Sequence, residues 1–299
     1  MIKYASYVLA ALLLLELALR LFGFANPPLY VEDRRYEYAF APNQDIDRFG
    51  NRTLTDSLGR RSGPLRDGEC VAAAFVGDSV INGGAPTDQA ELATTLLDSL
   101  VGPRSRVVNV SAGSWGPDNA AAFLRAHGDG GARRIVAVFS SHDAEDEMTF
   151  DPVVGVRSDA PAVRPVSAIW EAWDRYARPR LSRLVRSERP DASSPPPSES
   201  EPEARAPAGL NPGWTDLVAY ARDRDVPLTV YLHAETGEVE AGEYNEGGQR
   251  VLRLLDSLGV QVVRDLPTIR PDEYRDYIHL NARGQAAMAE RLSPLVSGC

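Results

Sequence analysis

Residues 70–79, with the sequence CVAAAFVGDS, form the stretch that decides the fold. The run from Val71 to Val76 is apolar throughout, which is typical of a strand buried inside a parallel sheet. Gly77, Asp78 and Ser79 follow it directly, so Ser79 is expected at the carboxyl end of that strand. Open α/β sheets bind their ligands at this edge. The stretch therefore predicts a buried strand with a reactive hydroxyl at its exit.

Outward from this strand, β-prone and helical segments alternate along the chain. Such alternation predicts a parallel sheet covered by helices on both faces. The expected strands are residues 71–76, 106–110, 134–139, 228–232 and 261–264, and the expected helices are 88–100, 117–127, 214–224, 244–258 and 282–296. We therefore predict an α/β fold with a five-stranded parallel sheet sandwiched by helices.

A motif near the other end of the chain complements Ser79. Asp276 and His279, in the sequence Asp-Tyr-Ile-His, lie just before the last predicted helix. A serine hydroxyl attacks a carbonyl effectively only when a neighbouring base takes its proton. His279 is the candidate base, and Asp276 can fix its tautomer and stabilise the imidazolium. Either motif alone is also compatible with an ordinary turn, but together they predict a Ser79, Asp276 and His279 triad.

The order of four segments resembles the SGNH/GDSL hydrolase superfamily. The segments are Gly77-Asp78-Ser79, residues 109–113, Ser141-His142-Asp143 and residues 276–279, and the resemblance covers roughly residues 70–296. It implies the flavodoxin-like SGNH hydrolase fold and a carboxylic ester hydrolase that works through an acyl-serine intermediate.

The resemblance also implies an oxyanion hole, the set of donors that stabilises negative charge on the carbonyl oxygen. Its backbone donors are the N–H groups of Ser79 and Gly113, with Ser114 as an alternative alignment for the second. The family has an asparagine side chain as third donor, and His142 stands at this position. We expect His142 to donate in its place; the alternative is an ordinary capping or strand-end residue.

The amino-terminal segment predicts a membrane anchor, residues 1–25. Residues 4–24 are almost continuously apolar, and a bilayer requires ~20 such residues as a helix. Glu16 and Arg20 interrupt the run at a spacing that lets them pair on one helical face. A cleaved signal peptide is the alternative, although no small-x-small cleavage site follows. Lys3 favours a cytoplasmic amino terminus, which places the remaining chain in the periplasm or outside the cell.

Two further segments frame the domain of residues 70–299. Residues 26–69 are expected as an extended juxtamembrane arm, and residues 144–212 as an insertion. Within the insertion, residues 187–207 are rich in proline, serine and glutamate and are predicted to be disordered. Residues 166–185 predict a helix with a stripe of Ile169, Trp170, Trp173 and Tyr176. The stripe is expected to pack on the domain, and a lid or sugar-stacking wall is the alternative.

Several other side chains were candidates for site roles. Trp115 is expected to line the pocket or to belong to the core, and His233 to be a hydrogen-bonded histidine rather than a site residue. Asp143, Asp146 and Glu147 are expected as solvated or capping charges, so no metal or cofactor is predicted. Cys70 and Cys299 either form one disulfide or remain free thiols.

Composition and the predicted location limit the classes of partner and substrate. The formal net charge of −10 disfavours nucleic acid as a partner. The expected substrate is an acylated glycan or a lipid ester, with O-acyl groups on envelope or secreted glycans preferred because of the predicted location. The alternatives are an acyltransferase that passes the group to a sugar hydroxyl, and a membrane-tethered glycan-binding or assembly protein with an impaired oxyanion hole.

Overall fold

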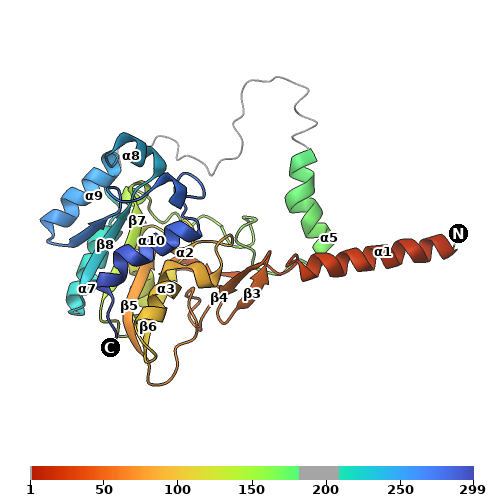
Figure 1. Ribbon diagram of the computed structural model, residues 1–299, viewed down its shortest axis with the longest axis horizontal. Coiled ribbons are helices and arrows are strands. Elements are labelled where there is room, and N and C mark those ends of the chain that lie inside the picture. Colours follow the sequence, from red (N-terminus) through yellow and green to blue (C-terminus); the bar gives the residue numbers. More distant parts are fainter. Residues whose placement is uncertain (1, 182–208) are drawn as a thin grey trace. The chain divides into compact units, whose positions relative to one another are not determined.

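Five parallel strands form the central sheet of the computed structural model, which describes residues 2–181 and 209–299 (Figure 1). Their order is β6-β5-β7-β8-β9. The first of these strands along the chain, β5, is therefore an interior strand, with β6 on one side and β7, β8 and β9 on the other. The strands are β5 (Cys70–Gly77), β6 (Ser105–Ser111), β7 (Ile135–Ser140), β8 (Leu228–His233) and β9 (Gln261–Arg264). The predicted fold class is confirmed.

Helices cover both faces of this sheet. They include α3 (Ala93–Leu100), α4 (Pro117–His127), α7 (Gly213–Asp223), α9 (Glu246–Ser257) and α10 (Ala282–Leu292). Helix α3 packs against α10, whereas α4 packs against α7. The strands between them are almost entirely buried, since Phe75, Val76 and Phe139 have no exposed surface. Burial on both faces explains why the strand sequences are apolar runs and not alternating patterns.

The observed helices differ from the predicted ones at two boundaries and by two additional short helices. The helix expected at 88–100 breaks at Leu92, whose extended backbone separates a 3₁₀ turn (Gln89–Glu91) from α3. The last helix ends at Leu292 and continues as a 3₁₀ turn, Ser293–Leu295. Two short helices, α2 (Ser79–Asn82) and α8 (Thr236–Ala241), were not predicted because each spans fewer than two turns.

Residues 26–69 are not simply an extended arm. They contain two antiparallel hairpins, β1 (Tyr30–Asp33) with β2 (Glu37–Phe40) and β3 (Asp45–Arg48) with β4 (Asn51–Leu54). Tyr36 and Tyr38 are 5% exposed and belong to the same hydrophobic core as the sheet strands. Pairing signals in strands of four residues are weak, which is why the sequence showed only turns there.

The chain divides into two compact units. One holds Pro28–Asp47, Asn51–Ala162 and Leu210–Cys299, and therefore contains the whole sheet. The other holds Met1–Pro27, Arg48–Gly50 and Val163–Gly209. Residues 187–207, predicted to be disordered, lie outside the described residues.

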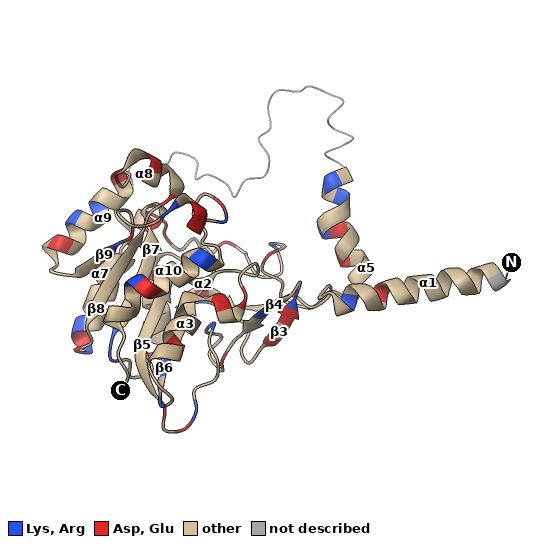
Figure 2. Ribbon diagram, in the orientation of Figure 1, with Lys and Arg blue, Asp and Glu red and all other residues tan. Residues whose placement is uncertain are grey.

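The smaller unit is built around α1 (Ile2–Leu21), which is apolar and long enough to cross a membrane over Tyr4–Leu21. Figure 2 shows this helix without charge along most of its length, with an acidic and a basic band toward its carboxyl end. The predicted ion pair is confirmed, because Arg20 Nε lies 2.8 Å from Glu16 Oε1.

The helix of the insertion begins at Ala168 as α5 (Ala168–Glu171) and widens into a π-helix, Ala172–Ala177. The expected apolar stripe is divided. Tyr176 contacts Phe24 and Phe49, at ring-centre distances of 5.5 and 6.1 Å. Trp170 and Trp173 are 63% and 46% exposed, so the prediction that the stripe is packed away is wrong for these two side chains.

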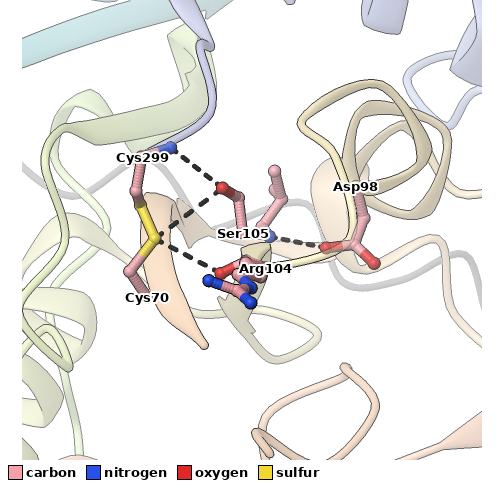
Figure 3. The surroundings of a disulfide bond; sticks show 6 residues. Cys70, Asp98, Arg104, Ser105 and Cys299 are labelled. Carbon is pink, nitrogen blue, oxygen red and sulfur yellow. Dashed lines mark hydrogen bonds between the residues drawn. A yellow bond between two sulfur atoms is a disulfide. The ribbon is translucent and has the colours of Figure 1, made fainter. Parts of the chain in front are cut away.

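A disulfide closes the larger unit (Figure 3). It joins Cys70, at the start of β5, to Cys299, with 6.4 Å between the Cα atoms. The Cys299 backbone N–H donates to Ser105 Oγ at 2.9 Å, which fastens the segment to the start of the neighbouring strand β6. The structure thus shows that Cys70 and Cys299 form a disulfide, which is one of the two alternatives that the sequence left open.

We expect the paired replacement Cys70→Ser and Cys299→Ser to lower the free energy of unfolding by about 2–5 kcal/mol, because the unfolded chain regains the freedom of a long loop. Urea unfolding of the full chain measures this difference. A reducing agent should destabilise the wild type and leave the double variant unchanged. Equal unfolding midpoints for wild type and double variant would contradict the prediction.

Candidate active site

Ser79 occupies the first residue of α2, directly after β5. The Asp78 carboxylate caps this helix by accepting from the Val80 N–H at 2.9 Å, and Gly83 ends it in the left-handed conformation. Gly77 must lack a side chain, since a Cβ there would lie 2.2 Å from the Val138 carbonyl oxygen. The Gly-Asp-Ser sequence therefore turns the strand sharply into a helix and leaves the Ser79 N–H among the unpaired donors of a helix start.

The loop before α10 supplies the histidine. Asp276 Oδ1 accepts from the backbone N–H groups of Ile278 at 3.1 Å and His279 at 2.7 Å, which forms a tight turn. The same carboxylate lies 2.9 Å from His279 Nδ1. Burial alone would raise the pKa of Asp276, but the backbone hydrogen bonds from His279 and Ile278, together with the charge and side-chain hydrogen bond of His279, outweigh it and lower that pKa. Asp276 is therefore ionised and orients the imidazole of His279.

Ser79 and His279 meet although 200 positions separate them. His279 Nε2 lies 2.9 Å from Ser79 Oγ. With the Nδ1 proton facing Asp276, Nε2 is the acceptor for the serine hydroxyl proton. The side chain of His279 is 15% exposed and that of Asp276 is 41% exposed, so the array lies at a solvent-accessible rim. This is the geometry that proton transfer from a serine requires.

A buried pair beneath the His279 loop was not predicted to contribute to the site. His233, at the end of β8, is fully buried; its Nδ1 lies 2.7 Å from Asp265 Oδ2 and its Nε2 lies 2.8 Å from the Ile278 carbonyl oxygen. Both ring nitrogens face acceptors, so an ionised Asp265 requires a proton on each. Burial lowers the pKa of His233, but the charge of Asp265 outweighs it and raises the pKa overall. The expectation that His233 is hydrogen-bonded is confirmed. One of its two partners, Ile278, is the residue directly before His279.

A second set of buried contacts holds the Ser79 helix. Asn109 Nδ2 donates to the Ile81 carbonyl at 2.8 Å, and Asn82 Nδ2 donates to the Ser111 carbonyl at 3.0 Å. Arg61, from the segment expected as an arm, is 1% exposed and donates to the carbonyl oxygens of Asn82, Gly84 and Thr87. Arg61 was missed because no local pattern marks an arginine that will be buried by a distant loop.

His142 follows β7 in a 3₁₀ turn, Ser141–Ala144. Its Nε2 lies 3.2 Å from Asp143 Oδ1, and its Nδ1 lies 3.7 Å from Glu235 Oε1. Burial lowers the pKa of His142, but the carboxylates of Asp143, Glu235 and Asp78 outweigh it and raise the pKa. The side chain is 42% exposed, so water screens part of this attraction. The neighbouring carboxyl groups therefore favour the protonated form of His142, which has an N–H on each side of the ring.

Asp78, His142 and Asp143 place one oxygen or nitrogen each within 4.8 Å of one another. Burial raises the pKa of both Asp78 and Asp143. Asp143 is 1% exposed and accepts from the Ser140 N–H, so its capping role is confirmed and its solvation is not. Asp146 and Glu147 are exposed as expected. The three clustered groups have the donor types of a cation site, but a protonated His142 cannot act as a ligand.

The segment after β6 places Gly113 and Ser114 at the same sheet edge as Ser79, because Gly77 and Ser111 are register partners. A Cβ on Gly113 would meet no heavy atom within 4 Å, so this backbone borders open space. Trp115 does not line it. This side chain is 1% exposed, donates to the Tyr38 carbonyl and packs on Tyr36, so it belongs to the core.

We expect His233→Gln to lower the free energy of unfolding by about 3–5 kcal/mol at acidic pH, because Asp265 loses its buried partner. The raised pKa fixes the sign. The stabilisation is complete below the unfolded pKa of 6.5 and is lost as the pH rises through the higher folded value. Urea unfolding at a series of pH values measures this loss.

His127→Gln is the matched control. Burial lowers the pKa of His127, so its contribution must change with pH in the opposite sense. A pH-independent difference between wild type and His233→Gln would exclude the charged His233.

Comparisons with known proteins find similarity to solved structures alone. No protein-family model matches the sequence, and no curated protein matches it significantly. A solved member of the lipolytic protein G-D-S-L family from Veillonella parvula is 10% identical, with a TM-score of 0.41 over 76% of this chain and 98% of that chain. A carbohydrate acetylesterase family member from Sinorhizobium meliloti is 14% identical, with a TM-score of 0.37 over 75% and 96%. The inhibitor-bound aryl esterase of M. smegmatis is 12% identical, with a TM-score of 0.41 over 76% and 97%. The chain is thus similar to solved GDSL-family lipolytic proteins and esterases, at a distance that assigns no activity by itself.

Proposed function

We propose that this protein is a carboxylic ester hydrolase of the SGNH/GDSL type with Ser79 as nucleophile. The observation that carries the proposal is the continuous hydrogen-bonded chain from Ser79 Oγ through His279 to Asp276. A solvent-accessible serine placed at a helix start, with an oriented imidazole at 2.9 Å, has the arrangement of an activated nucleophile.

In the proposed reaction, Ser79 Oγ attacks the ester carbonyl carbon while His279 Nε2 takes the hydroxyl proton. The tetrahedral intermediate collapses when His279 returns this proton to the leaving alcohol, which leaves an acyl-serine. A water molecule then attacks the acyl carbon while His279 takes a proton from it. His279 gives this proton to Ser79 Oγ, which releases the carboxylic acid and restores the serine. Asp276 stabilises the imidazolium in both halves of the cycle.

The proposed oxyanion hole consists of the backbone N–H groups of Ser79 and Gly113 with the side chain of His142. The position of Ser79 at the helix start and the open space beside Gly113 support the first two donors. His142 carries a proton on each ring nitrogen in its carboxylate surroundings. It would donate to the oxyanion by turning one N–H away from Asp143 or Glu235, and it would add a positive charge that an asparagine lacks.

We further propose that α1 anchors the protein in the membrane, with the domain in the periplasm or outside the cell, where it removes O-acyl groups from envelope or secreted glycans. The apolar span Tyr4–Leu21 supports the anchor. The disulfide between Cys70 and Cys299 supports an oxidising compartment.

One observation favours a second candidate, a glycan-binding or assembly protein without turnover. Both ring nitrogens of His142 lie near carboxyl oxygens, at 3.2 and 3.7 Å, so these oxygens compete with a substrate oxyanion for its N–H groups. Losing one oxyanion donor slows turnover by roughly a hundred- to a thousandfold.

We expect Ser79→Ala to abolish acetate release from p-nitrophenyl acetate by the purified full chain. Mass spectrometry after treatment with a fluorophosphonate should find the adduct on Ser79 of the wild type and none on the variant. Ser257→Ala, on the distant helix α9, is the matched control and should keep wild-type turnover. Equal turnover by Ser79→Ala would exclude the acyl-serine mechanism, and an unlabelled wild type would favour the binding protein.

We expect His142→Ala to reduce kcat by roughly a hundred- to a thousandfold with little change in KM, because the donor acts on the transition state. His142→Asn should retain most of the activity, since an amide can donate at the same place. Steady-state kinetics on the same ester compares the three proteins. Unchanged kcat in His142→Ala would remove His142 from the oxyanion hole.

A further inference from the structure

Glu16 is a carboxylate inside an apolar helix, and its hydrogen bonds come from the insertion. Oε1 accepts from the Ala168 N–H at 2.9 Å, and Oε2 accepts from the Ile169 N–H at 3.0 Å and from Ser167 Oγ at 3.0 Å. The remaining partner is Arg20 Nε at 2.8 Å. Arg20 Nη2 in turn donates to the Val166 carbonyl at 2.6 Å. The two charged residues of α1 therefore hold the start of the insertion helix.

The depth of this contact follows from helix geometry and rests on the proposed anchor. The span Tyr4–Leu21 has 18 residues, so it is about 27 Å long, close to the thickness of a bilayer core. Glu16 precedes Leu21 by five residues, which places its Cα about 7.5 Å inside the end of that span. The start of α5 is bonded to a group at this depth, so it must enter the boundary between headgroups and acyl chains.

A second contact holds the insertion helix to the same unit. Glu171 pairs with Arg48 at 2.7 Å, and the side chains of this pair are 1% and 8% exposed. Glu171 also accepts from the backbone N–H of Ala25, four residues beyond α1. Separating a buried ion pair would leave two uncompensated charges. These bonds therefore hold one side of the insertion helix against the segment that follows α1.

The opposite side of the insertion helix exposes aromatic and aliphatic side chains. Trp170 and Trp173 are three residues apart, so they lie on one face, and they are 63% and 46% exposed. Val166, just before the helix, is 93% exposed. Trp has an apolar body with one polar N–H, and it concentrates at membrane interfaces for that reason.

We propose that the insertion helix, residues 168–181, lies in the bilayer interface with Trp170 and Trp173 inserted among the lipids. The occupant of this exposed face is the lipid surface itself, because the face continues from a membrane-spanning helix to which it is hydrogen-bonded at interfacial depth. Glu16 and Arg20 then serve to dock this helix, so their charges are neutralised and hydrogen-bonded where water is scarce. The protein is held by one spanning helix and one interfacial helix.

Tryptophan fluorescence tests the proposal because of where the four tryptophans lie. Trp115 and Trp214 are each 1% exposed in the core of the larger unit, so lipid cannot reach them. The full chain is reconstituted into phosphatidylcholine vesicles with or without bromine on carbons 6 and 7 of one acyl chain, and vesicle flotation confirms insertion. We expect brominated lipid to quench up to about half of the emission, the share of two tryptophans in four.

The variant Trp170→Phe with Trp173→Phe should lose this quenching, keep floating with the vesicles and keep the wild-type rate on a soluble ester. Glu16→Leu should float and show weaker quenching, because the start of α5 is released.

Emission that is insensitive to brominated lipid but quenched by aqueous acrylamide overturns the proposal and leaves the anchor intact. Protection from both quenchers together with chemical crosslinking between chains overturns it in favour of a second copy. A chain that does not float overturns both the anchor and the interfacial helix, whereas the esterase assay is independent of either.

Discussion

The hydrogen bond between Ser79 and His279 is the contact on which the proposed activity depends, because it joins the proposed nucleophile to its proposed base. The sheet fixes the first partner, since β5 lies between β6 and β7 and its carboxyl end cannot move without disturbing both neighbouring strands. The second partner lies on a loop, which is intrinsically less constrained. The buried Asp265 and His233 pair compensates for this by holding the Ile278 carbonyl, one residue before His279. A rigid strand and a fastened loop thus bring the hydroxyl and the imidazole to 2.9 Å.

Much of this arrangement could be predicted from sequence. Buried parallel strands are continuous apolar runs, so the five strands were located within one or two residues. Ser79 follows such a strand, and Asp276 and His279 lie in the loop before the last helix. The hairpins of residues 30–54 were missed because strands of four residues carry little pattern. Arg61 and Asp265 were missed for a different reason. Each gains its role from a partner distant in sequence, and burial of a charged residue has no local signal.

His142 shows how one histidine affects the electrostatics of the candidate site. Asparagine would be neutral and would leave Asp78 and Asp143 as two buried carboxyls facing each other. His142 lies beside both of them and 3.7 Å from Glu235, at the start of α8, so three acidic groups surround one imidazole. The same contacts that stabilise the charge of His142 oppose the movement that donation to a substrate would need.

The covalent closure of the larger unit has a consequence for its integrity. Ser79 and His279 both lie between the two linked cysteines, Cys70 and Cys299. If a protease cuts one peptide bond between Ser79 and His279, the two fragments stay joined through sulfur. The proposed nucleophile and base would then belong to separate polypeptides that cannot diffuse apart, so a nicked molecule keeps the means to reassemble the candidate site.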